Sequence, residues 1–196
     1  MTQKRRALIL MLPLAFAACA GVTPPETATL PSNYLLGAGD PTRGAVFAAS
    51  GTFARPAQLQ GQPAAAARAL ANMEYITVAL PQDPLMTIRL DGMTELQLLA
   101  ARREWRSALG VAEGAPAQGV IDGLLAAEAA LSANEPGRAG AALATPAFTA
   151  GPEATLARLA ALPPLPQTAR AAEMARMSLD RQIEVPRDMS SRGRHR

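Results

Sequence analysis

The pattern of apolar positions between residues 63 and 80 is that of an amphipathic helix. Six apolar residues recur there at spacings of three and four, which places them on one helical face; they are Ala66, Ala69, Leu70, Met73, Ile76 and Leu80. Pro63 suits the first position of a helix because its missing N–H has no partner there in any case. Pro81 and Pro84 interrupt the pattern and favour an end near residue 80.

The other segments repeat this arrangement, with prolines and Asp-Pro or Asp-Gly pairs at the points where helices begin. We expect helices over 41–50, from 83 to 109 with a break at Asp91-Gly92, and over 116–133, 136–144, 152–162 and 166–185. Gly51 and Gly110 suit helix ends, and Pro186 is expected to end the last helix. Residues 86–90 alternate weakly between apolar and polar, which is compatible with a short strand without an obvious partner.

Composition supports this helical pattern. Alanine accounts for 44 residues, Val and Ile together for 11, and aromatic residues for only 4%, whereas strands are usually rich in Val, Ile and aromatic residues. The prediction is an all-α domain over residues 34–185, with six to seven short Ala/Leu-rich helices in a bundle or helical-hairpin array. The 36-residue spacing of Pro116 and Pro152 resembles the helical hairpins of tetratricopeptide proteins, but their Trp, Leu-Gly and Tyr signature positions are not matched.

Rare residue types exclude several chemistries. The sequence holds a single Cys (Cys19), a single His (His195) and a single Lys (Lys4). An intrachain disulfide, a Cys/His zinc site and a P-loop with its lysine therefore cannot form. A Ser-His-Asp system would need a fixed imidazole, and the one His lies at the very end of a basic tail. We expect neither a cofactor nor a bound metal.

The N-terminus has the anatomy of an export signal. Residues 2–6 are basic, and residues 7–18 carry no charge but are too few to span a bilayer. The end of this stretch, Ala17-Ala18-Cys19, resembles the lipobox of bacterial lipoproteins, with Phe16 where Leu is usual. The resemblance implies a signal peptide over 1–18, lipid on Cys19 and a membrane anchor through that lipid.

The residue after the cysteine indicates to which membrane a bacterial lipoprotein is delivered. Position 20 is Ala rather than Asp, which by the sorting logic of that family implies the outer membrane, with the body facing the periplasm of a bacterial cell envelope. Two alternatives stay open. The A-x-A patterns ending at Ala17 and Ala20 fit ordinary signal cleavage and a soluble exported protein, and residues 7–20 also fit a buried helix of a cytosolic protein.

Removing residues 1–18 changes the charge balance. The mature chain would hold 16 basic and 16 acidic residues, so the basic pI of the precursor does not argue for nucleic acid as a partner. Residues 19–33 contain Pro24, Pro25 and Pro31 and predict a flexible tether after the lipidated Cys19. We expect residues 186–196 to form a basic disordered tail.

Three residues on one predicted helix are candidates for binding. Arg102 and Arg106 are four apart and repel each other, so an anion or a carboxylate from another helix would relieve the repulsion. As a binding site, the pair would take an anionic envelope polymer or an acidic partner. The alternative is a solvated or salt-bridged pair. Trp105 is the sole Trp, a residue type enriched at binding sites, yet its spacing with Leu and Ala equally fits the core.

Glu74 is the candidate for catalysis. It lies near the edge of the apolar face of its helix, where partial burial raises a carboxyl pKa and suits a general acid. The leading hypothesis is nevertheless a non-catalytic, lipid-anchored envelope protein that binds or scaffolds other envelope components. Its rivals are a carboxylate-dependent hydrolase or lyase acting on cell-wall glycan and a carrier of apolar ligands between Ala-lined helices.

Overall fold

A computed structural model describes residues 25–31, 40–84 and 90–191, with side chains in the last helix described as far as Arg181. Within these ranges the chain forms helices and no strand, so the all-α prediction is confirmed. The helices are α1 (Pro41–Phe53), α2 (Pro63–Ala79), α3 (Gly92–Leu109), α4 (Ala117–Ser132), α5 (Pro136–Leu143), α6 (Pro152–Ala160) and α7 (Pro166–Ser191). Short 3-10 turns, η1 (Pro56–Leu59) and η2 (Leu80–Gln82), follow α1 and α2. The expected signal peptide, Cys19 and nearly all of the segment 86–90 lie outside the described residues.

Capping residues set the starts of α1 and α3 and the end of α3 where the sequence indicated, whereas α1 continues past the expected end at Gly51 to Phe53. The Asp40 carboxylate accepts the Thr42 N–H at 2.9 Å, and Asp91 accepts the Thr94 N–H at 2.7 Å. Each carboxylate thereby satisfies a backbone donor that the helix itself leaves without a partner. At the other end of α3, Gly110 adopts a left-handed backbone with φ 80°, which glycine adopts at little cost.

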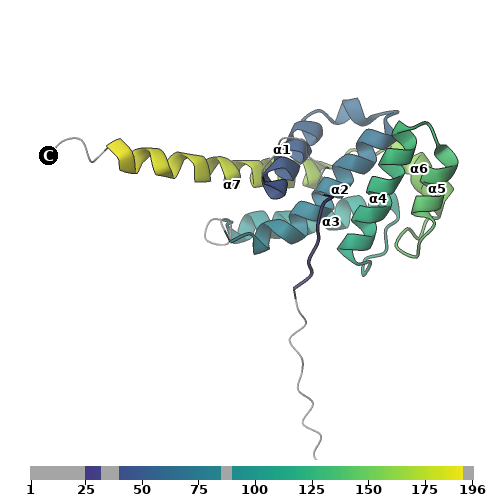
Figure 1. The fold of residues 1–196 in the computed structure, drawn as a ribbon, viewed down its shortest axis with the longest axis horizontal. Helices are drawn as coiled ribbons and strands as arrows, with labels where there is room; N and C mark the ends of the chain where they lie inside the picture. The colour runs from purple at the N-terminus through teal and green to yellow at the C-terminus, as the bar shows by residue number, and fades with distance from the viewer. Residues whose placement is uncertain (1–24, 32–39, 85–89, 192–196) are drawn as a thin grey trace, which may run out of the picture.

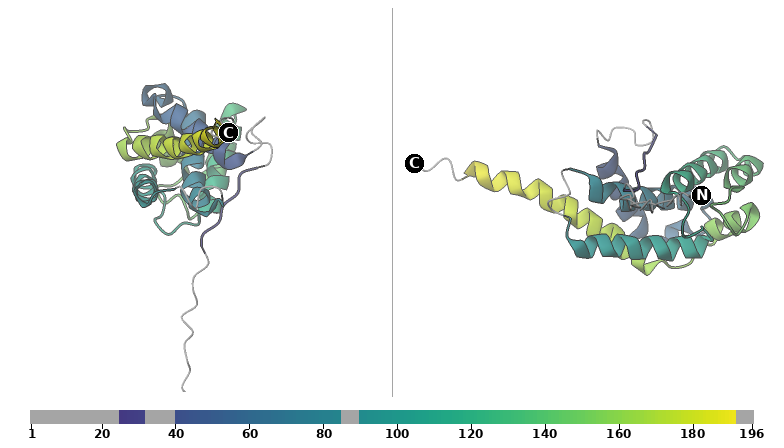
Figure 2. Two further views of the ribbon diagram at one scale, coloured as in Figure 1. Left: turned by 90° about the vertical axis from the view of Figure 1, so that its left-hand side faces the viewer. Right: turned by 90° about the horizontal axis from the view of Figure 1, so that it is seen from below.

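Helix α2 is the central element of the body. It packs against α1, α3, α4 and α6, while α7 covers α1 and α3 and α5 joins α4 to α6. The views in Figures 1 and 2 show α2 surrounded by these helices, and the last turns of α7 projecting beyond them. Nearly every residue of α2 from Ala66 to Val78 is therefore buried, and the many alanines let neighbouring helices approach closely.

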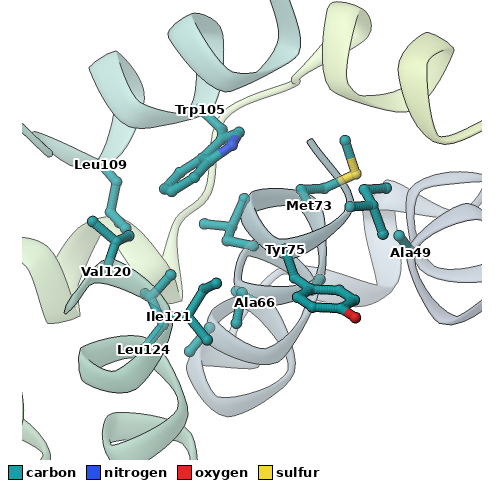
Figure 3. Packing of buried hydrophobic residues seen from close by; sticks show 14 of the residues in the cluster. Ala49, Ala66, Met73, Tyr75, Trp105, Leu109, Val120, Ile121 and Leu124 are labelled. Carbon is teal, nitrogen blue, oxygen red and sulfur yellow. The ribbon is translucent and has the colours of Figure 1, made fainter. Parts of the chain in front are cut away.

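The core contains large side chains from several helices around α2. Trp105 and Leu109 come from α3, and Val120, Ile121 and Leu124 from α4; all are fully buried. Figure 3 shows them facing α2. The interpretation of Trp105 as a core residue is confirmed, because none of its surface reaches solvent.

The predicted end of the last helix is wrong. Helix α7 continues past Pro186 to Ser191, into the segment expected to be a disordered tail. Proline removes one backbone donor and disfavours the preceding turn, but extending a helix that is already formed costs far less than starting one. Here the proline does not end the helix.

Part of the predicted flexible tether contacts the body. Residues 25–31, which we call the strap, have no regular secondary structure but lie on the body. Ala28 and Leu30 pack against the core, and Glu26 and Thr29 form hydrogen bonds with groups on α3 and α4. The sequence did not predict these contacts, and the flexibility of residues 19–33 stays a prediction.

Candidate functional site

A buried ion-pair cluster joins α2 and α3. The Glu74 carboxylate, with no exposed surface, accepts hydrogen bonds from Arg102 Nε at 2.9 Å and Arg102 Nη2 at 2.5 Å. Arg106 donates to the same carboxylate through Nε at 3.3 Å and through Nη2. One turn of α3 separates the two arginines, so both point at one spot on α2. Glu74 thus supplies the carboxylate from another helix that the arginine pair required.

Arg106 also fixes the loop that leads into α4. Its Nη1 donates to the carbonyl oxygens of Ala112 at 3.1 Å and Glu113 at 2.9 Å, and its Nη2 donates to that of Ala115 at 2.9 Å. With 4% of its surface exposed, the guanidinium uses its donors within the protein. The role of Arg106 is therefore to connect α2, α3 and the α3–α4 loop.

Arg102 extends the cluster to the surface, where it meets the strap. Its Nη1 donates to Glu26 Oε2 at 2.8 Å, and the other oxygen of Glu26 accepts the Ala117 N–H at 2.6 Å. Ala117 is the first residue of α4, so Glu26 places a negative charge at a helix N-terminus, where the helix dipole favours it. Two glutamates and two arginines make the cluster neutral.

The ionisation of the outer pair follows from these contacts. Partial burial acts to raise the pKa of Glu26, but the hydrogen bonds from Arg102 and the Ala117 N–H, with the charges of Arg102 and Arg106, outweigh it, and the pKa lies below its usual value. Burial acts to lower the pKa of Arg102, while its bonds to Glu26 and Glu74 raise it above the usual value. Both groups are therefore charged at neutral pH.

The structure brings all four candidate residues of the sequence together, with Glu74 enclosed, and a cleft of about 510 Å³ that Arg102 and Arg106 help to line lies beside them. Trp105 is in the core, and its Nε1 is a buried donor that no described residue accepts. Arg106 is buried, and Arg102 is largely covered by Glu26 and Glu74. Sequence reasoning missed Glu26, although Glu26 is the only charged residue between Cys19 and Asp40, which was a signal that it has a partner.

This arrangement does not favour acid–base chemistry at Glu74. A general acid must reach its substrate, whereas this carboxylate is enclosed and engaged by two guanidinium groups. No group of three His, Cys, Asp or Glu side chains capable of holding a metal is found among the described residues. Within the same ranges, no helix has both the length and the apolar character needed to cross a bilayer.

Two surfaces of the body are open and apolar. A cleft of about 440 Å³ lies between η1 and the α6–α7 connection, lined by Phe53, Pro56, Ala57, Leu59, Gln60, Leu162, Pro163, Pro164, Leu165, Pro166 and Ala169. Its volume is in the range of small-ligand pockets. The second surface is an exposed face of α3 that carries Met93, Leu96 and Leu99.

Comparisons with protein-family models, with curated proteins and with solved structures find no match. The resemblance of the Pro116 and Pro152 units to tetratricopeptide hairpins therefore gains no support from a family match.

Proposed function

We propose that this chain is a lipid-anchored protein of the bacterial cell envelope, held at the outer membrane by lipid on Cys19, whose helical body binds or scaffolds other envelope components without catalysing a reaction. The observation that carries the proposal is the ending Ala17-Ala18-Cys19 after a basic start and a short apolar stretch. It is strengthened by the fact that this cysteine is the only one in the chain. Several acyl chains on one residue would give a durable anchor, since each buried methylene contributes about 0.8 kcal/mol.

Two features of the body support a binding role. Glu74, the candidate for catalysis in the sequence, is instead the centre of a buried ion-pair cluster. The cleft beside the Pro163–Pro166 connection instead offers an apolar, concave surface of the kind that binds a partner segment. The described residues thus favour recognition over acid–base chemistry.

The anchor is tested by the intact mass of the protein from membranes. We expect a chain that begins at Cys19 with a diacylglyceryl group and added acyl mass, and accumulation of the uncleaved form when lipoprotein signal peptidase is inhibited. Cys19→Ser should release the protein into the periplasm, and Ala20→Ser, which keeps the cysteine, should leave it on the membrane. An unlipidated wild-type chain beginning at Ala18 or Gly21 would refute the anchor.

The binding role is tested at the cleft. A photo-cross-linking amino acid in place of Ala57, which lines the cleft and is exposed, should give discrete adducts with envelope proteins in living cells. The same group in place of Ala54, which is exposed outside the cleft lining, is the matched control. Equal adduct patterns at the two positions would count against the cleft as a binding surface.

A further inference from the structure

The strap lies on the body in the way that a bound peptide lies in its receptor. Gln82 Nε2 donates to the Glu26 carbonyl oxygen at 2.5 Å. Gln118 Oε1 accepts the Thr29 N–H at 2.8 Å, and Gln118 Nε2 donates to the Thr29 carbonyl oxygen at 3.3 Å. Two side-chain amides therefore bind the main chain of an extended segment, a type of contact that any sequence of suitable backbone conformation can make.

Specificity in this groove comes from charge. The Glu26 carboxylate is bound between the Arg102 guanidinium and the first N–H of α4. Without Glu26, the two arginines face Glu74 alone, which leaves one uncompensated positive charge beside a helix N-terminus. A carboxylate in an incoming peptide would restore neutrality and accept both hydrogen bonds.

Few buried contacts hold the strap on the body. Ala28 and Leu30 are only partly buried, the other strap residues are exposed, and 40% of the Glu26 side chain reaches solvent. A cleft of about 290 Å³ lies alongside, lined in part by Thr27, Ala28 and Tyr75, so the strap does not fill the space available. Segments with few buried apolar contacts open at low free-energy cost.

We propose that the groove formed by Gln82, Arg102, Gln118 and the N-terminus of α4 is a binding site for an extended acidic peptide, which the chain's own strap occupies as an internal ligand. The partner is a segment of another envelope protein with a Glu or Asp at the position of Glu26. This rests on the proposed binding function of the body and names the class of partner. Binding of the partner displaces the strap.

The test measures peptide binding to the unlipidated mature chain (Cys19→Ser), so its outcome does not depend on the anchor. The probe is a fluorescent synthetic peptide with the sequence of residues 24–33, followed by anisotropy. In the Glu26→Gln chain the internal competitor is weakened by the loss of a charged hydrogen bond, so we expect the peptide to bind at least about tenfold more tightly than to the chain with Glu26. A probe with Gln in place of its Glu should bind about tenfold less tightly.

Matched variants separate the groove from general surface binding. In the Glu26→Gln chain, Gln118→Ala should weaken the peptide about tenfold, and Gln58→Ala, an exposed amide away from the groove, should not change it. Equal affinities for the two probes, or no gain in the Glu26→Gln chain, would overturn the proposal. If the chain forms a dimer that Glu26→Gln abolishes, the occupant of the groove is a second copy of this chain. That result would overturn the proposal that the partner is a different protein.

Discussion

Replacing Glu74 by Gln tests the ion-pair cluster most directly. The amide is close in size to the carboxylate but neutral, so Arg106, with 4% of its surface exposed, would keep its charge without the buried partner that now neutralises it. Removing one member of a buried ion pair costs about 3–5 kcal/mol. For a domain whose total stability is about 5–15 kcal/mol, this is a large fraction, and at about 2–4 °C per kcal/mol the Tm should fall by about 10 °C.

The assay is urea and thermal unfolding of the unlipidated chain. Far-UV circular dichroism follows the helices, and the fluorescence of Trp105, the only Trp and a fully buried one, follows the core. Glu95→Gln is the matched control, since Glu95 is an exposed carboxylate in the first turn of α3; the loss of its charge there should cost about 0.3–1 kcal/mol, well below the loss expected for Glu74→Gln.

A loss of less than about 1 kcal/mol for Glu74→Gln would refute this reasoning. It would mean that Arg102 and Arg106 are satisfied by other groups, and that the neutrality of the cluster is not what stabilises the contact between α2 and α3.

Three further outcomes are expected. Because the folded-state pKa of Glu26 is lowered, strap docking is stable above the usual carboxyl range and is lost as the pH falls through that lowered pKa, which hydrogen exchange of the strap amides measures. Gly123→Ala should cost about 1–3 kcal/mol because its Cβ would meet the buried Phe148 ring at 2.7 Å, whereas Gly119→Ala on the same helix has open space and should gain up to about 1 kcal/mol; urea titrations compare the two. Asp91→Ala removes the cap of α3 and should lower the free energy of unfolding by about 1 kcal/mol in the same titrations.

Helix positions could be predicted because their signals are local. Asp40 and Asp91 cap through atoms two or three residues away, and Gly110 ends α3 through its own backbone. The end at Pro186 failed for a related reason. Proline weakens a helix locally, but whether the helix stops also depends on the turns already formed before it.

The ion-pair cluster was only half predictable. The spacing of Arg102 and Arg106 shows that they share a face and need an anion. That the anion is Glu74 depends on how α2 crosses α3, and Ala-rich faces fit several crossings. Docking of Glu26 is still harder to predict from the sequence, since it depends on the position of the α4 N-terminus.

In the lipid-anchored protein that we propose, docking of the strap would shorten the segment that links Cys19 to the body. Five residues, 20–24, separate that cysteine from the strap, and a fully extended chain from Cys19 to the first residue of the strap spans about 20 Å. When the strap is displaced, the linking segment extends through residue 39, and a fully extended chain of that length spans about 70 Å. The volume that the body can explore around its anchor grows with the cube of that length. A partner that displaces the strap would therefore also let the anchored body move away from the membrane surface and meet components deeper in the periplasm.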